Sequence, residues 1–178
     1  AEMERRILPG SRTDLTALIE AAIAGRKDVH ISLESHDVQK IYDQRIIMDE
    51  GKPETLSGEG INCIDRILED YNAFFGTGRT FEDLKKCGYL NMCDCFVTPV
   101  WLFEKLMTFI CPVIESGKLD AFDTMRKHRL QGNLLERYIA VFFALEDIEK
   151  VDLSTVHQFW RKLRPGLLSR IWSGMTGH

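Results

Sequence analysis

Five polar side chains in the second half of the sequence have the chemistry to bind phosphate groups and to move a proton. Arg129 and Arg137 carry planar guanidinium groups, which bind phosphate oxygens in pairs. They stand eight residues apart, just over two helical turns, so a helix would bring them roughly to one face. Asp94, Glu136 and His128 carry groups that serve as a general base toward a hydroxyl.

Glu136 and Arg137 also have purely structural interpretations. Glu136 comes three residues after Asn133, which is the spacing of a capping box at the start of a helix. Arg137 is able to pair with a carboxylate behind a buried helix. The sequence leaves a structural role and a site role open for both residues.

The other three candidates lie in two different local settings. His128 and Arg129 end a basic segment, 126–129, which is either a phosphate site or an ordinary solvated loop. Asp94 stands at the edge of a predicted strand, and strand ends border the clefts of α/β proteins. It is therefore either a site carboxylate or an ordinary strand-edge residue.

The cysteines favour a reduced, cytoplasmic protein. Their number is odd, and no Cys-x-x-Cys or His-x₃₋₅-His spacing is present. A zinc site built from Cys87, Cys93, Cys95 and His128 is the alternative to simple packing of small side chains, which explains these cysteines better. The full set is Cys63, Cys87, Cys93, Cys95 and Cys111.

In the first third of the chain, apolar spacing predicts a helix over residues 14–24 and a half-buried strand over 29–33. Ser35 opens a second predicted helix, whose apolar positions extend to Ile46. Residues 49–60 are polar and rich in Gly, which predicts a loop. This loop is either a plain connector or a mobile substrate loop.

A third helix is predicted over residues 61–75, and Thr80 with Asp83 has the spacing of a weak capping box for a short helix.

The rest of the chain predicts a strand over 93–98 and a helix from Pro99 to the Ser-Gly pair at 116–117, kinked or broken at Pro112. A strongly apolar, largely buried helix follows Asn133, and a short strand follows at 151–153. The predicted fold class is therefore α/β, helix-rich with a few short strands.

Length and composition place the chain among ordinary globular proteins with a single domain. It has 178 residues, of which 44% are hydrophobic and 28% charged. The formal net charge of -4 argues against general nucleic-acid binding. The sequence contains no run of about 18 apolar residues, so it predicts no membrane-spanning helix.

Residues 94–143 form a longer pattern of residue types and predicted elements. A short apolar strand leads into a helix with a Pro near its end, and a basic loop leads into Arg-x-x-Gly-x-x-x-Glu-Arg. This order resembles the DUF4422 family of capsular polysaccharide glycosyltransferases, over most of residues 5–146, with Ile7-Leu8-Pro9 near the start. Asp94 stands where that family has a neutral amide. The positions in register are Phe96, Phe103, Pro112, Arg129, Gly132, Glu136, Arg137 and Val141.

The resemblance implies the carboxy-terminal part of a GT-A nucleotide-sugar transferase fold. It implies transfer of a sugar from a nucleotide-sugar donor to a saccharide acceptor during synthesis of bacterial surface polysaccharide. Asp94 and Glu136 would then be catalytic, and His128, Arg129 and Arg137 would bind substrate. We expect Asp94, Arg129 and Glu136 to converge on one cleft.

The family's amino-terminal, nucleotide-facing portion has no counterpart here, so an upstream domain of the same protein is expected. No cofactor is evident, and a divalent metal would be held only through residues outside this chain. The alternative is a non-catalytic helical interaction or accessory module of a larger protein.

Residues 150–178 form a basic and aromatic tail after the core at 5–149. Within it, residues 160–172 mix Trp and Leu with Arg and Lys. Such a segment either contacts the anionic inner face of a membrane or packs back on the domain or on a partner.

Overall fold

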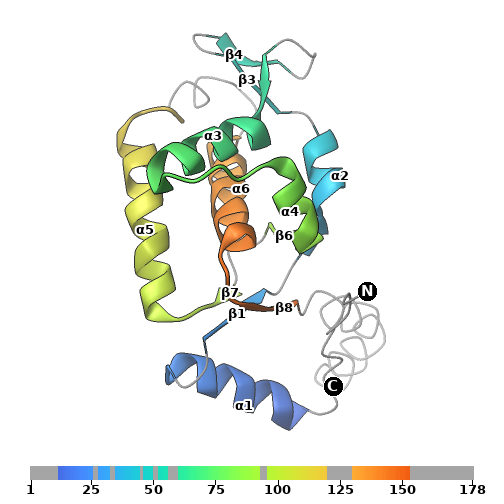
Figure 1. The fold of residues 1–178 in the computed structure, drawn as a ribbon, viewed down its shortest axis with the longest axis vertical. Helices are drawn as coiled ribbons and strands as arrows, with labels where there is room; N and C mark the ends of the chain where they lie inside the picture. Colours follow the sequence, from blue (N-terminus) through green and yellow to red (C-terminus); the bar gives the residue numbers. More distant parts are fainter. Residues whose placement is uncertain are drawn as a thin grey trace, which may run out of the picture.

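The computed structural model describes residues 12–25, 28–32, 35–44, 46–49, 52–55, 60–92, 96–119 and 130–152 (Figure 1). Its helices are α1 (Arg12–Ile23), α2 (Val38–Asp43), α3 (Cys63–Phe75), α4 (Phe81–Cys87), α5 (Val100–Glu115) and α6 (Leu130–Leu145). Its strands are β1 (Val29–Ser32), β2 (Ser35–Asp37), β3 (Ile47–Asp49), β4 (Lys52–Thr55), β5 (Ile61–Asn62), β6 (Tyr89–Asn91), β7 (Phe96–Val97) and β8 (Glu149–Asp152). The mixed, helix-rich class with short strands is confirmed. In this described part, none of the helices is both long enough and apolar enough to cross a membrane.

The described strands form three small sheets. β1 is the central strand of the order β7-β1-β8, antiparallel to β7 and parallel to β8. β2 pairs with β6, and β3 lies between β4 and β5. Figure 1 shows the β3–β4 hairpin beyond one end of the helices, whereas the β1 sheet and α1 lie at the other end.

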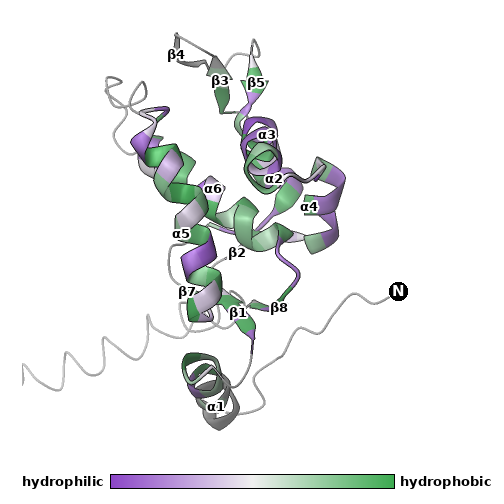
Figure 2. Ribbon diagram, turned by 60° about the vertical axis from the view of Figure 1, so that its left-hand side comes forward, coloured by the Kyte–Doolittle hydropathy of each residue, from purple (hydrophilic) through white to green (hydrophobic). Residues whose placement is uncertain are grey.

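The main core is built around α6. Helices α3, α4 and α5 and strand β6 all contact it, and it runs through the middle of the helical layer in Figure 1. The rings of Tyr71, Phe75 and Phe109 pack beside Phe142 of α6, with centroids 6.1 to 6.5 Å from that ring. The prediction that this apolar helix is largely buried is therefore confirmed. By contrast, α4 carries much of the hydrophilic colour in Figure 2, and only Leu84 of it is buried.

A buried carboxylate ties α6 to two neighbouring helices. Glu146, just after the end of α6, accepts hydrogen bonds from Lys105 Nζ at 2.6 Å and from Tyr71 Oη at 3.1 Å. Burial and this carboxylate raise the pKa of the Tyr71 hydroxyl well above its usual value, so the tyrosine stays a donor. The contact fixes α3, α5 and the end of α6 relative to one another.

Strand β1 is fully buried, whereas the alternation of residues 29–33 predicted a half-buried strand. Val29 and Ile31 form a small second core with Ala22 of α1 and Val151 of β8. On the opposite face, the ring of His30 stacks on Phe143 of α6, with centroids 3.9 Å apart. The prediction was wrong because both faces of the strand are covered, one by α1 and the other by α6.

The helix predicted from Ser35 begins later. Residues 35–37 form β2, which pairs with β6, and α2 starts at Val38. Asp37 is the cap residue, and its carboxylate accepts a hydrogen bond from the Lys40 amide at 2.9 Å. The pairing of residues 35–37 with the distant strand β6 overrides the local helical spacing there. Ile46 lies beyond the end of α2.

The predicted loop at 49–60 also contains regular structure. Asp49 ends β3, and Lys52–Thr55 forms β4, which pairs with β3. Among the described strands, β4 is an edge strand with β3 as its neighbour, and an edge position accommodates Pro53. Pairing between strands carries little local sequence signal, and the prediction of a bare loop was wrong for this reason.

Pro112 does not break α5. The helix runs from Val100 through Pro112 to Glu115, with Pro99 as its cap residue. Pro112 lies in the last turn, where the lost amide removes a single backbone hydrogen bond. Buried Ile110 and Val113 on either side of the proline keep this turn packed against the core.

The capping box predicted at the start of α6 does not form. The helix begins at Leu130, so Asn133 is its fourth residue and not its cap. The capping interpretation of Glu136 is therefore wrong. The other predicted box is confirmed: Thr80 and Asp83 form a reciprocal capping box at the start of α4.

Candidate functional site

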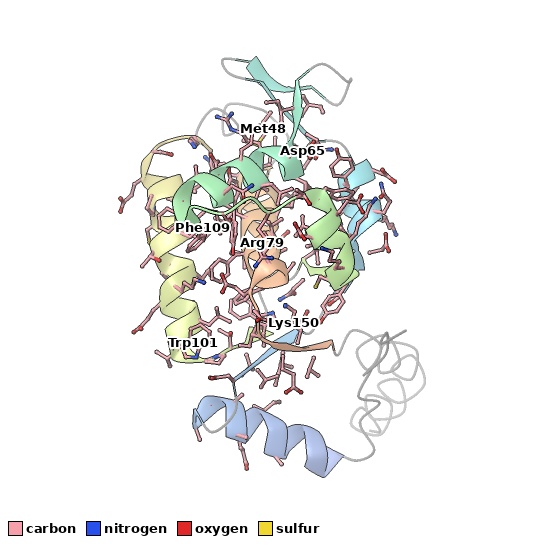
Figure 3. All side chains as sticks on the ribbon, viewed as in Figure 1. Met48, Asp65, Arg79, Trp101, Phe109 and Lys150 are labelled. Atoms are coloured by element: carbon pink, nitrogen blue, oxygen red, sulfur yellow. The ribbon has the colours of Figure 1, made fainter. Side chains whose placement is uncertain are left out.

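A positively charged hollow lies where α4, the end of α6 and the start of β8 meet. Its volume is about 290 Å³, and we call it the basic hollow. Figure 3 shows two of its labelled residues, Arg79 and Lys150, near the end of α6. The residues lining it are Arg79, Asp83, Lys86, Cys87, Ala144, Leu145 and Lys150.

Arg79 is positioned by the tight turn between α3 and α4. Gly76 ends α3 in the left-handed conformation, with φ of 64°, which glycine adopts without strain. The side chain of Asn72 then bonds both backbone groups of Arg79, donating to its carbonyl at 2.8 Å and accepting from its amide at 2.7 Å. No hydrogen bond or ion pair engages the Arg79 guanidinium among the described residues, which leaves its five donors for a ligand.

Lys86 enters the hollow from the last turn of α4. Its Nζ donates to Asp83 Oδ1 at 2.7 Å, while Asp83 Oδ2 accepts from the Thr80 amide at 2.9 Å. The Lys86 ammonium and the two Thr80 donors lower the pKa of Asp83 to about 2. Asp83 therefore stays ionised at neutral pH and fixes the position of Lys86.

Lys150 enters from β8 and closes the carboxyl end of α6. Its Nζ donates to the carbonyl of Glu146 at 2.6 Å, and the carbonyl of Ile148 lies at 3.5 Å. A cation at this end is favoured by the partial negative charge of the helix terminus. Lys150 also lines the hollow, so its third proton is available to a ligand.

The net charge of the hollow is opposite in sign to the net charge of the chain. Arg79, Lys86 and Lys150 face a single carboxylate, Asp83, so the lining is positive by two charges. The whole chain carries a formal charge of -4. A local excess of cations around an open volume attracts anions, and phosphate is one of the groups that guanidinium and ammonium donors bind well.

A much smaller cavity adjoins the hollow. It shares Cys87, Ala144 and Lys150 with the hollow, and we call it the inner chamber. Its volume is about 10 Å³, close to the smallest that holds one water molecule. The residues lining it are His30, Cys87, Tyr89, Asn91, Ala140, Phe143, Ala144 and Lys150.

Cys87 stands between the two spaces as a neutral thiol. Burial raises its pKa, and the nearby Lys150 opposes this shift only in part. The thiolate is the nucleophilic form of cysteine, so Cys87 is not an activated nucleophile at neutral pH.

Among the residues predicted from the sequence, the structure describes Glu136 and Arg137. Arg137 is 6% exposed, and its guanidinium donates to the Asn133 carbonyl at 2.9 Å and to Gln44 Oε1 at 2.7 Å. It lies seven residues before Ala144, about 10 Å along the helix, so it is not part of the basic hollow. Glu136 is its half-buried neighbour on α6.

Asp94, His128 and Arg129 lie outside the described residues, as do Cys93, Cys95 and the tail from residue 153 onward. The convergence of Asp94 and Arg129 on Glu136 therefore remains a prediction. In the described ranges, no group of three or more His, Cys, Asp or Glu side chains is arranged to hold a metal ion.

The sequence analysis missed the cations of the hollow. These residues are separated in the sequence, and nothing in their local sequence distinguishes them from ordinary surface charges: Arg79, Lys86 and Lys150. The available signal was indirect: the Thr80–Asp83 capping box fixes where α4 begins, and hence which lysine in its last turn shares a side with Asp83. The contribution of β8 depends on a parallel pairing with β1 across more than 100 residues.

No family model, no curated protein and no solved structure matches the chain. The resemblance of residues 94–143 to the DUF4422 family therefore stays a prediction from the motif alone.

Proposed function

We propose that the chain is a glycosyltransferase-type domain that binds the phosphate groups of a nucleotide-sugar donor in the basic hollow. The observation that carries the proposal is the arrangement of Arg79, Lys86 and Lys150 around one open volume. The Arg-x-x-Gly-x-x-x-Glu-Arg motif supports the sugar class and the role in bacterial surface polysaccharide synthesis.

The chemistry of sugar transfer explains why these cations would be needed. Breaking the bond between the sugar and the diphosphate leaves negative charge on the phosphate oxygens, and fixed cations stabilise that charge as it develops. Arg79 supplies a planar fork and the two lysines supply point charges, as in other phosphate sites. Glu136 and Asp94 remain the proposed carboxylates for the acceptor hydroxyl, and His128 and Arg129 the proposed substrate-binding residues. Arg137 is assigned the structural role instead, because it is buried and bonded to Gln44.

The test is a thermal-shift panel of nucleotide sugars with UDP, GDP, dTDP and CMP carriers, performed on the full chain. A ligand at about 100 times its dissociation constant adds roughly 2.7 kcal/mol to the free energy of unfolding. We expect at least one carrier to raise the melting temperature of the wild type, and Arg79→Gln to reduce that rise. A shift that is unchanged in Arg79→Gln would contradict the placement of the phosphates.

The second candidate function is a non-catalytic module that binds a helix of another protein through α5. Four apolar side chains of α5 are 37% to 70% exposed: Val100, Phe103, Met107 and Ile114. Their spacings of three, four and seven residues form the kind of stripe that packs against a second apolar helix. The absence of any shift across the nucleotide-sugar panel, with the full-length protein, would favour this function.

A further inference from the structure

The inner chamber contains a buried side chain whose hydrogen-bonding capacity is unused. His30 is 2% exposed, and neither Nδ1 nor Nε2 has a hydrogen-bond partner among the described residues. A buried polar atom without a partner costs free energy, on the order of 1–3 kcal/mol. Such a cost calls for a hydrogen-bond partner in the chamber, either an ordered water or a group of a bound ligand.

The ring of His30 is held in place by packing and not by polar contacts. It stacks on Phe143 with an interplanar angle of 19°, and the ring of Phe96 lies 5.5 Å away at a tilt. The imidazole thus presents its nitrogens from a fixed orientation. Burial and the positive charge of Lys150 lower the pKa of His30 to about 3, so the ring is neutral and offers one donor and one acceptor.

Space beside His30 exists because α6 carries small residues on the side that faces β6. Ala140 and Ala144 lie one turn apart, and both line the chamber. Ala144 also lines the basic hollow, so the two spaces adjoin at this residue and at Cys87. A larger side chain at either alanine would fill the chamber.

The size and chemistry of the chamber define what fits in it. A volume of about 10 Å³ admits one water molecule or one hydroxyl group and excludes a phosphate. A neutral imidazole pairs with a group that both donates and accepts, as a hydroxyl does. A cation would be repelled by Lys150, which also lines the chamber.

We infer that the inner chamber binds one hydroxyl of a phosphorylated sugar whose phosphate lies in the basic hollow, and that His30 is the hydrogen-bond partner of that hydroxyl. The inference rests on the proposed function, and it adds a specificity-determining residue and a ligand class. The ligand class is a sugar linked directly to phosphate that carries a free hydroxyl near the linkage. A bare phosphate or diphosphate would occupy the hollow and leave the chamber unchanged.

The experiment compares wild type, His30→Phe and Arg79→Gln by calorimetric titration with pyrophosphate, glucose 1-phosphate and UDP-glucose. Phenylalanine keeps the stack on Phe143 and removes the ring nitrogens. We expect His30→Phe to weaken sugar-phosphate binding by about tenfold, the upper range for one neutral hydrogen bond, and to leave pyrophosphate binding unchanged. Arg79→Gln is expected to weaken the binding of all three probes.

A second measurement uses the wild type alone and does not depend on the folding of a variant. The ¹⁵N resonances of the His30 ring are expected to move with glucose 1-phosphate and to stay in place with pyrophosphate. Equal binding by wild type and His30→Phe, with unmoved ring resonances, would overturn the inference and leave the phosphate site intact. Absence of binding by every probe, with unmoved ring resonances, would overturn both.

Discussion

The two halves of α6 differ in how the polar groups around them are used. Beside the first half and the midpoint of the helix, Tyr138 and Lys118 both donate to the Asp70 carboxylate, at 2.7 and 2.8 Å, and Arg137 bonds Gln44. Beside the second half, three cations surround an open volume, and His30 is buried without a described hydrogen-bond partner. Most polar groups beside the first half, which we call the closed half, hold the fold together. Beside the second half, which we call the open half, the Arg79 guanidinium and the ring nitrogens of His30 have no hydrogen-bond partner among the described residues.

This contrast separates stability from binding along one helix. Burial and the Asp70 carboxylate raise the pKa of Tyr138 well above its usual value, which keeps that hydroxyl a donor at any ordinary pH. Lys86, in contrast, is held only by a surface carboxylate, and surface ion pairs contribute little to stability. Changes in the first half should therefore alter the free energy of unfolding, and changes in the second half should alter ligand affinity.

The largest expected effect is a loss of stability in the closed half. Leu134 is fully buried, so Leu134→Ala removes core contacts and leaves a cavity. We expect the free energy of unfolding to fall by about 3 kcal/mol in a urea titration. Pyrophosphate affinity, measured under conditions where the variant is folded, should match the wild type. A matching loss of affinity would contradict the separation.

The next effect is acid destabilisation through His30. The folded protein keeps this ring neutral down to about pH 3, whereas the unfolded chain protonates it below about 6.5. The unfolded state therefore binds more protons in that range, and stability falls as the pH falls, by ~1 kcal/mol per unit. In urea titrations between pH 6 and 4, His30→Phe should show a shallower loss than the wild type. Equal slopes would contradict the neutral, buried ring.

Lys150 is expected to affect both properties because it belongs to both the fold and the hollow. Lys150→Gln removes the cation at the carboxyl end of α6, which should cost about 0.5–1 kcal/mol of unfolding free energy. It also removes one of three cations in the hollow, so pyrophosphate affinity should fall by about tenfold. Chemical denaturation and calorimetry check the two effects separately, and a change in only one would show that Lys150 has a single role.

The smallest effect concerns Asp83. Its pKa of about 2 lies below the ordinary value of 3.8, so its stabilising contribution is present above about pH 4 and is lost as the pH falls toward 2. Asp83→Asn should flatten the stability profile in that range. The same change removes the carboxylate from the hollow and should raise pyrophosphate affinity several-fold at neutral pH. Unchanged or weaker affinity would contradict a binding mode dominated by charge.

The local parts of this fold were predictable from the sequence. The Thr80–Asp83 box and the apolar girth of α6 depend on neighbouring residues, and both are confirmed. The late start of α2 depends on the pairing of β2 with the distant strand β6, which leaves no local sign in the sequence. Strand β4 was missed because residues 49–60 are polar and rich in Gly. Burial of β1 on both faces likewise required knowing that α1 and α6 cover it.

The candidate site was less predictable than the fold. Arginine and glutamate in a motif attract attention, yet the buried Arg137 bonds Gln44, the residue that follows the end of α2. The hollow instead combines a turn residue, a helix-end lysine and a strand lysine, none of which forms a motif. Whether a charge faces an open volume is decided by tertiary packing, which residue spacing does not encode.

The central claim is that the basic hollow binds phosphate, and two adjacent lysines test it most directly. Lys85 and Lys86 both form ion pairs three residues back along α4, with Glu82 at 2.8 Å and with Asp83 at 2.7 Å, but only Lys86 lines the hollow. We predict that Lys86→Gln weakens pyrophosphate binding about tenfold in a calorimetric titration, whereas Lys85→Gln leaves it unchanged. Equal effects of the two substitutions, or none from either, would contradict the account.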